Sequence, residues 1–408
     1  MNILIITQLY PQPDDQGDNK PTHTVEYFAK EWVLAGHNVV VCHCSSKFPL
    51  LFYLIPSFVK NRIAGKTSNI IPPIESRKKI VRSEYGIKIY RFPMIKLFPG
   101  RGYSRKFLKK QAKNICMILN KKETFEPDLV LGHFANPSTE LVSLLSKKYN
   151  CMSSIVFHND CNTRNIDKYR LRESVSNIKA IGVRSVIDAY NVKSLLNLNE
   201  LPFICYSGVP DSYINNSCLE CKKHSFAYIN YLFVGSMIKR KNLDSVIKAY
   251  DKIHHNDNNS TFRIIGGGAE EKNSHDLVKA LDNHNIKFLG RVDRTEVMDA
   301  MEKANVFTLI SDFEVFGMVY FEAMLQGCLV IASKGGGFDG IIVDGVNGFI
   351  CEPGNELMLF DIYKRIEEMS ENERNKIGQN AIDTAKKYSE SSVAKQYLND
   401  ILERNNYE

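Results

Sequence analysis

The sequence predicts an α/β protein with two doubly wound parallel sheets, and three observations lead to this prediction. The chain opens with an apolar run at 2–10, a polar loop, an amphipathic helix and a second apolar run at 38–42, which is the order of a parallel β-α-β unit. At 408 residues the chain is longer than one hydrophobic core usually supports. Short apolar runs alternate with helical segments again in the second half of the chain, so two domains of this type are expected.

The first helix is predicted by the spacing of five apolar residues, which fall at i, i+3, i+4, i+7 and i+8. They are Val25, Phe28, Ala29, Trp32 and Val33. This spacing gives a helix with one apolar face, which packs on a sheet. The segment at 11–21 that precedes the helix is polar and contains Gly and Pro, so it is predicted to be a loop.

Two further strands are predicted in the first half, at 128–131 and 154–157. His133 follows the first strand, and His158 and Asp160 follow the second. In open α/β sheets, ligands bind at the carboxyl ends of strands. Both histidines are therefore candidate site residues, although a lone His is more often a structural residue.

Composition and pattern also indicate where the domains divide. The N-terminal domain is expected to span 1–210, and the polar segment at 211–227 is expected to be a linker. The C-terminal domain is expected to span 228–385, beginning with a strand. An amphipathic helix is predicted within the final segment, 386–408.

The central stretch of the chain comprises a short buried strand predicted over 306–310, a loop, and a helix predicted over 318–326. Glu314 lies in the connecting loop, Gly317 precedes the helix, and Glu322 lies one turn into it. Gly327 is placed to cap the end of the helix.

This arrangement has a chemical meaning. A helix N-terminus, here at Met318 and Val319, attracts phosphate because its first N–H groups lack partners and its dipole is positive. Carboxylates repel phosphate, so Glu314 and Glu322 are better suited to accept hydrogen bonds from the hydroxyls of a sugar and a ribose. Taken alone, two Glu residues eight apart also fit an ordinary solvated helix face.

Composition limits the classes of protein to which this chain can belong. With 44% apolar and 24% charged residues, the chain resembles a soluble globular enzyme. No signal peptide is recognised at Met1, and the most apolar region, 48–59, is shorter than the roughly 20 residues of a membrane-spanning helix. A cytoplasmic protein that does not cross a membrane is expected. The ten cysteines are scattered, and Cys218, Cys221 and His224 lack the second pair of a zinc site, so free thiols are expected.

The charge is unevenly distributed. Residues 47–123 contain 19 Lys and Arg against three Glu and no Asp, a net charge of +16, whereas the remainder of the chain has a net charge of −9. Such an excess points to an anionic partner. An apolar patch at 48–59 followed by cations is typical of a segment that docks on an anionic membrane, and the alternative is a buried hairpin beside a solvated basic helix. Nucleic acid is not expected because no recognition motif accompanies the charge.

Several motifs in series resemble family 4 of the retaining, nucleotide-sugar-dependent glycosyltransferases, which have the two-domain GT-B fold. They are 262–268 (FRIIGGG), 286–292 (IKFLGRV), Glu314 to Glu322, and 336–348 (GGFDGIIVDGVNG). Their order and spacing match the C-terminal half of that family. The resemblance implies two Rossmann-like domains facing a central cleft.

The resemblance also implies roles for individual residues. Glu322 would bind ribose hydroxyls, backbone near Arg291 would contact the base, and Lys241 with the start of the helix, Gly317 to Val319, would hold the diphosphate. Glu314 and His158 would contact the transferred sugar. The family usually has an Arg where Ser236 stands, and Arg240 is the candidate replacement. The family's first loop often holds paired glycines, whereas only Gly17 is present here, and the last helix of the family returns to the N-terminal domain.

The function implied is transfer of a hexose from UDP or GDP to a glycan acceptor linked to polyprenyl diphosphate, in bacterial surface-polysaccharide assembly, by an enzyme peripheral to the inner face of the cell membrane. No Asp-x-Asp pair occurs in the chain, so neither a metal nor another cofactor is expected. Three alternatives remain open: a soluble acceptor, a sugar-nucleotide epimerase of the same fold, and a non-catalytic nucleotide-binding protein.

Overall fold

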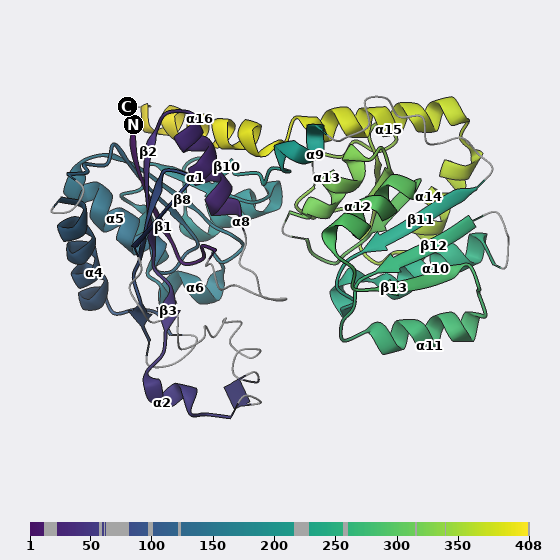
Figure 1. Ribbon diagram of the computed structural model, residues 1–408, viewed down its shortest axis with the longest axis horizontal. Coiled ribbons are helices and arrows are strands. Elements are labelled where there is room, and N and C mark those ends of the chain that lie inside the picture. Colours follow the sequence, from purple (N-terminus) through teal and green to yellow (C-terminus); the bar gives the residue numbers. More distant parts are fainter. Residues whose placement is uncertain are drawn as a thin grey trace. The chain divides into compact units, whose positions relative to one another are not determined.

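The computed structural model of the chain describes most of its length. The described residues are 1–11, 23–56, 59–60, 62, 81–96, 101–120, 124–215, 228–255, 260–314, 316–338 and 340–406. They form two compact units. The N-terminal unit comprises Met1–Arg184, Asp188–Cys205 and Val393–Glu408, and the C-terminal unit comprises Ser185–Ile187 and Tyr206–Ser392. Each unit contains a sheet of predominantly parallel strands with helices packed on it, which confirms the predicted fold class (Figure 1).

The N-terminal unit is built on an eight-stranded sheet in the order β10-β9-β8-β7-β1-β2-β5-β4. The strands are β1 (Asn2–Thr7), β2 (Asn38–His43), β4 (Val81–Glu84), β5 (Ile87–Arg91), β7 (Leu129–His133), β8 (Met152–Val156), β9 (Ala180–Val183) and β10 (Phe203–Ile204). All neighbours pair in parallel except β4 and β5. The strand order reverses between β1 and β7, and such a switch point is where open α/β sheets bind ligands.

Helices and one small sheet complete this unit. The helices are α1 (Thr24–Leu34), α2 (Leu50–Tyr53), α4 (Arg105–Ile118), α5 (Ser138–Tyr149), α6 (Thr163–Lys168), α7 (Leu171–Val175) and α8 (Val186–Leu196), and the small sheet pairs β3 (Ser46–Lys47) with β6 (Met94–Ile95). In Figure 1, α4 lies beside α5, which itself packs against β7 and β8.

The C-terminal unit has a six-stranded, wholly parallel sheet in the order β13-β12-β11-β14-β15-β16. The strands are β11 (Ile229–Val234), β12 (Ser260–Ile265), β13 (Ile286–Gly290), β14 (Val306–Leu309), β15 (Leu329–Ser333) and β16 (Phe349–Cys351). From the centre of the sheet, β11, β12 and β13 follow one another toward one edge. β14, β15 and β16 follow one another toward the other edge. The switch point therefore lies between β11 and β14, whose carboxyl ends carry two of the predicted site loops.

The C-terminal unit contains one 3₁₀ helix and several α-helices among the described residues. They are α9 (Asp211–Asn215), η3 (Lys239–Lys241), α10 (Leu243–Ile253), α11 (Glu271–Leu281), α12 (Arg294–Lys303), α13 (Met318–Leu325), α14 (Glu356–Glu368) and α15 (Glu371–Lys386). α13 packs against α12, α15 and β15, which buries most of its side chains. Gly327 follows Gln326, the C-cap residue of α13, and adopts a left-handed φ of 70°, as expected of a helix-ending glycine.

The last helix, α16 (Glu390–Asn406), begins in the C-terminal unit, and its residues from Val393 onward belong to the N-terminal unit. Trp32 of α1 donates a hydrogen bond from Nε1 to the Ala394 carbonyl at 2.9 Å. The Trp32 ring also packs against Tyr397, which is 1% exposed. These contacts attach the end of the chain to the core of the N-terminal unit.

The apolar segment near residue 50 forms the short helix α2, not a hairpin. Phe52 is buried, but Leu50, Leu51 and Leu54 are 58%, 77% and 79% exposed. An exposed group of leucines is unusual for a surface that contacts only water. None of the described helices has the length and apolar character needed to cross a membrane.

Some of the predictions lie outside the described residues. These concern Gly17, part of the basic stretch 47–123 (including Lys66 and Arg77–Lys79), the cluster Cys218, Cys221 and His224, and most of the expected linker. The first residues of that linker, 211–215, form α9, which packs against α13.

Candidate active site

The candidate site is built from the two loops at the switch point of the C-terminal sheet. One loop follows β11 and contains η3, and the other follows β14 and contains Glu314. The Asp312 N–H donates to the Arg240 carbonyl at 2.8 Å. The Asn242 side chain donates to the Ile310 carbonyl at 3.0 Å and to Asp312 Oδ1 at 2.7 Å. These hydrogen bonds fix the two loops against each other, although the loops are about 70 residues apart in the sequence.

Lys241 and Glu314 form an ion pair at this point. Lys241 is only 7% exposed, and its Nζ donates to Glu314 Oε2. Ser311 Oγ donates to the same carboxylate oxygen at 3.3 Å. Burial lowers the pKa of Lys241, and the neighbouring Glu314 opposes this shift. The pair therefore places a cation and a hydrogen-bond acceptor together in a partly desolvated position.

Arg240 adds a second cation to the pair. Its Nη1 donates to the Phe313 carbonyl at 2.6 Å and lies 3.4 Å from Glu314 Oε2. The Arg240 side chain is 45% exposed, so it remains accessible to a ligand. The sequence suggested Arg240 as the replacement for the family Arg, and the structure puts its guanidinium beside Glu314 and Lys241.

The start of α13 lies at the end of the same loop. Gly317 has a left-handed φ of 75°, and a Cβ at this position would lie 2.6 Å from the Tyr320 ring. Only glycine fits there. α13 then begins at Met318 and Val319 with no side chain capping its N-terminus. An uncapped helix start beside two cations is an environment that suits an anion.

Glu322 is almost completely buried, at 3% exposure, and is ion-paired with Arg294. Arg294 Nε donates to the Tyr213 hydroxyl at 2.9 Å, and the guanidinium lies over the Tyr213 ring at 5.5 Å. Burial raises the pKa of Glu322, and Arg294 counteracts this rise. The carboxylate predicted to bind ribose is thus held in place by a cation.

Arg294 was not predicted from the sequence. A local signal existed, because Asp293 and Glu296 form a capping box that fixes the start of α12 at Arg294. Nothing local indicates the contact with Glu322, which is 28 residues away. That contact depends on the packing of α12 against α13.

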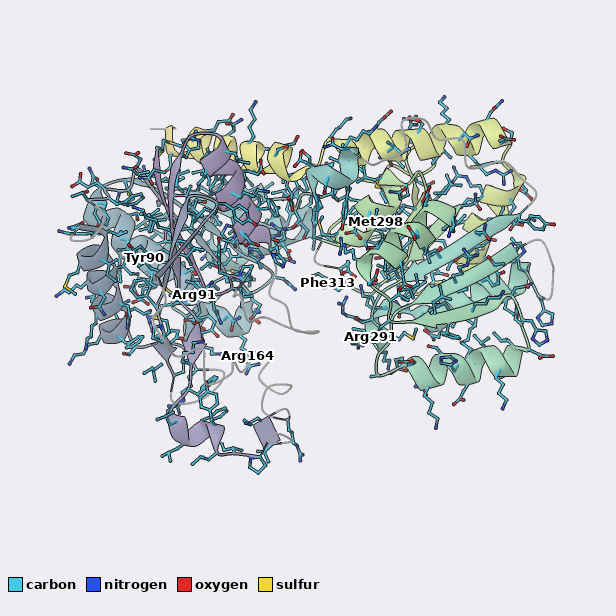
Figure 2. The ribbon with its side chains drawn as sticks, in the orientation of Figure 1. Tyr90, Arg91, Arg164, Arg291, Met298 and Phe313 are labelled. Carbon is cyan, nitrogen blue, oxygen red and sulfur yellow. The ribbon has the colours of Figure 1, made fainter. Side chains whose placement is uncertain are left out.

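Glycines bring the loops after β11 and β12 into contact. A Cβ at Gly266 would lie 1.9 Å from the Gly235 carbonyl oxygen, and one at Gly268 would lie 2.4 Å from the Met237 carbonyl oxygen. Only glycines permit this approach. Arg291 follows the next strand, β13, and lies along the same edge of the unit as Phe313 (Figure 2).

The two predicted histidines lie together in the N-terminal unit. His133 ends β7 and His158 follows β8, and His133 Nδ1 lies 3.0 Å from His158 Nε2. Burial and the charge of Arg184 lower the pKa of both rings, that of His133 to about 3. Both histidines are therefore neutral at physiological pH, and His158 is suited to hydrogen bonding instead of charge pairing.

Asp160 fixes the position of the His158 loop. Its carboxylate accepts hydrogen bonds from the backbone N–H groups of His158, at 3.0 Å, and of Ala135. Phe134 stacks on the His158 ring with 4.1 Å between centroids. Burial raises the pKa of Asp160 to about 6. Its contacts are those of a residue that positions His158.

The predicted site residues other than Arg291 thus form three groups. Lys241, Arg240 and Glu314 are in contact, with the helix start at Gly317 to Val319 on the same loop. Glu322 forms a separate group with Arg294 and Tyr213. His158 belongs to the other unit. Among the described residues, no group of three or more His, Cys, Asp and Glu side chains is arranged to hold a metal ion.

Comparison with known proteins identifies the C-terminal part of the chain. Residues 227–384 match the family model of glycosyl transferases group 1. This part of the chain, less than half of its length, is therefore similar to that family. An uncharacterized glycosyltransferase of Methanocaldococcus jannaschii is 29% identical over 359 residues, which cover 82% of this chain and 93% of that protein. The matches support a glycosyltransferase that uses a nucleotide sugar.

Solved structures show that both units together have the GT-B fold. A glycosyltransferase from Rickettsia africae superposes with a TM-score of 0.68 at 16% identity, covering 100% of this chain and 99% of the other. HepE from Anabaena, in complex with UDP, superposes with a TM-score of 0.64 at 17% identity, covering 99% and 100%. At these identities the similarity concerns the fold.

Proposed function

We propose that the protein is a retaining hexosyltransferase that moves a sugar from UDP or GDP to a lipid-linked glycan acceptor during assembly of a cell-surface polysaccharide. The observation that carries the proposal is the contact of Lys241 with Glu314 beside the uncapped start of α13, within the part of the chain that matches the family model of glycosyl transferases group 1. Retention and the surface-polysaccharide role are supported by the resemblance of the sequence motifs to family 4.

The donor nucleotide binds in the C-terminal unit under this proposal. The diphosphate lies against Lys241, Arg240 and the N–H groups at the start of α13. These groups are positioned before the reaction, so they stabilise the charge that develops on the leaving diphosphate without reorganisation. Because protein cations supply this stabilisation, no metal ion is needed. HepE, whose fold is similar, was solved with UDP bound, which supports a donor of this class.

The remaining donor contacts follow from the same arrangement. Glu322 accepts hydrogen bonds from the ribose hydroxyls, and backbone near Arg291 contacts the base. Glu314 and His158 hold hydroxyls of the transferred sugar. The buried position of Glu322 makes its hydrogen bonds stronger than they would be in water.

The acceptor is proposed to be lipid-linked because the N-terminal unit combines exposed leucines with cations. Leu50, Leu51 and Leu54 are exposed on and beside α2, and Lys60 and Arg62 follow them. Exposed apolar side chains next to Lys and Arg are typical of segments that dock on an anionic bilayer. The enzyme would then work on the inner face of the cell membrane, on a glycan carried by polyprenyl diphosphate.

A panel of UDP and GDP sugars tests the donor assignment by thermal shift, because a ligand that binds the folded state raises the melting temperature. One nucleotide should raise it, with or without a sugar attached. Transfer is then tested by the release of free nucleotide diphosphate. Release that requires an acceptor supports a transferase, whereas conversion of the donor without acceptor identifies an epimerase. Absence of any stabilising nucleotide contradicts the proposal.

A further inference from the structure

Lys96 is a cation in a buried position of the N-terminal unit. It directly follows β6 and is only 5% exposed, and its Nζ lies over the Tyr103 ring, 4.7 Å from the centroid. Within the part of the chain that the structure describes, no Asp or Glu lies within ion-pair distance of this ammonium group. Burial of a charge without an ionic partner is costly.

The Tyr103 ring that Lys96 contacts is held in place. The Tyr103 hydroxyl donates to the Met94 carbonyl at 3.1 Å and is hydrogen-bonded to Ser46 Oγ at 2.9 Å. The preceding residue, Gly102, packs so closely on α6 that a Cβ would lie 2.9 Å from the Lys168 carbonyl oxygen. This packing joins the Lys96–Tyr103 pair to the end of α6.

α6 brings two more cations to the same region. Arg164 and Lys168 are four residues apart and share one face of the helix, where like charges repel. The acid on this helix, Asp167, is 91% exposed and lies 3.9 Å from Arg172, so it does not neutralise them. Arg164 is exposed and extends outward from the unit (Figure 2).

The electrostatic effects connect the three cations in a chain. Burial, followed by the charge of Lys168, lowers the pKa of Lys96 to about 8. Burial, followed by the charge of Arg164, lowers the pKa of Lys168. Asn165, which lies on α6 between Arg164 and Lys168, donates a hydrogen bond from Nδ2 to the Asp160 carbonyl at 2.9 Å, and Asp160 positions the His158 loop. The cations therefore adjoin the loop that carries a candidate sugar-binding residue.

We propose that Lys96, Lys168 and Arg164 form a binding site for the phosphoryl groups of the acceptor. Three cations lie on and beside α6, one of them buried, and an anion with more than one negative charge would compensate them. Phosphate and diphosphate carry such charge and accept hydrogen bonds from ammonium and guanidinium groups. This inference rests on the proposed transferase function, and it names the part of the acceptor that the N-terminal unit recognises.

The test is calorimetric titration of the full-length protein with inorganic pyrophosphate. An excess of UDP or GDP, whichever stabilises the protein, is present so that the donor diphosphate position is filled. Wild type should bind pyrophosphate at one further site. Lys96→Met, Lys168→Met and Arg164→Met should each raise its Kd by about tenfold, the loss expected for one charged hydrogen bond. A matched control, Lys147→Met with Lys148→Met, removes two exposed cations of the same unit and should leave the Kd unchanged.

The outcomes separate specific from general effects. Equal weakening by the control pair would mean that the net charge alone attracts pyrophosphate, and absence of a second binding event would also overturn the proposal. Arg164→Met alters an exposed side chain, so its result does not depend on repacking of the core. Nucleotide binding is measured in every variant. If wild type binds the nucleotide but does not bind pyrophosphate, only this inference is rejected. If wild type binds no nucleotide, the proposed donor is rejected.

A second probe distinguishes the source of the phosphoryl group. Farnesyl diphosphate carries the same diphosphate attached to an isoprenoid chain. If it binds at least about tenfold more tightly than pyrophosphate, and the three substitutions weaken both ligands, the site serves a prenyl-linked acceptor. Equal affinity for the two probes assigns the site to a soluble phosphorylated acceptor.

Discussion

Arg294, the first residue of α12, is ion-paired with the buried carboxylate of Glu322 in α13, and Tyr213 of α9 holds the guanidinium from its other side. Glu322 would otherwise be an unpaired charge in a nearly dry environment. The pair favours the ionised carboxylate, which is the form proposed to accept hydrogen bonds from ribose hydroxyls, although burial favours the protonated form.

Replacing Arg294 by Met should destabilise the protein near neutral pH. Glu322 has a raised pKa in the folded state, so its ionisation opposes folding above the ordinary carboxyl pKa, and loss of Arg294 enlarges that effect. Breaking a buried pair costs about 3–5 kcal/mol, but Arg294 is 59% exposed, so we expect about 1–2 kcal/mol. Urea unfolding measures this loss, which should shrink as the pH is lowered toward 4.5.

The double variant Arg294→Met with Glu322→Gln provides the control. Gln carries no charge to be left unpaired, so the double variant should recover part of the stability and should lack the pH dependence of Arg294→Met. A loss of stability that is the same at all pH values, and the same with Gln at 322, would show that Arg294 contributes packing only.

The two glutamates of the central stretch should differ in kinetic effect. Glu322→Ala should raise the Kd of the nucleotide, because it removes the proposed ribose acceptor. Glu314→Ala should chiefly lower kcat, because Glu314 is proposed to contact the reacting sugar. We expect the Kd to rise about tenfold or more in Glu322→Ala and kcat to fall by a similar factor in Glu314→Ala. Titration calorimetry and steady-state kinetics separate the two parameters. Equal changes of both parameters in both variants would contradict the assignment.

Glu314 should also control the charge of Lys241. Burial lowers the pKa of Lys241 and Glu314 opposes that shift, so Glu314→Gln should lower the pKa further. The cation is lost as the pH rises through this pKa, so nucleotide affinity should fall at a lower pH in Glu314→Gln than in wild type. Measurement of Kd between about pH 6.5 and 9.5 tests this. Lys241→Arg with Glu314→Gln should show no such fall, because a guanidinium stays charged.

Transfer activity should persist in EDTA. Lys241 and Arg240 lie at the position proposed for the diphosphate, and they supply the charge that a divalent metal provides in other enzymes. Rates measured with EDTA and with added Mg²⁺ or Mn²⁺ should agree. Loss of activity in EDTA that either metal restores would show that these cations do not replace a metal.

The protein should bind anionic vesicles and dissociate from them at high salt. Each Lys or Arg near such a surface contributes about 1 kcal/mol. Sedimentation should recover wild type with the vesicles at low salt but not a variant in which five cations are neutralised. These are Lys60, Arg62, Arg77, Lys78 and Lys79. Wild type that remains in solution at low salt would contradict the membrane assignment.

The exposed leucines allow the apolar part of this interaction to be tested separately. Leu50, Leu51 and Leu54 replaced by Ser should weaken vesicle binding at every salt concentration, because apolar burial is not screened by ions. The melting temperature should change little, since these side chains are already exposed. A large fall in melting temperature would instead indicate that they support the core.

The sequence by itself determined the fold class and the elements that carry the site. Helix and strand periodicity depend on residues close in the chain, so α1, β14 and α13 were predicted to within a few residues of their observed ends. Gly317 and Gly327 could be assigned to the two ends of α13 for the same reason, because turn and cap geometry is local.

Only the tertiary structure decided which charges meet. Lys241 and Glu314 are 73 residues apart, and Arg294 and Glu322 are 28 apart. Lys96 lies near the end of α6, which carries Arg164 and Lys168, through the packing of Gly102 and Tyr103. These contacts depend on how strands and helices pack, and the short-range pattern of the sequence does not encode that packing.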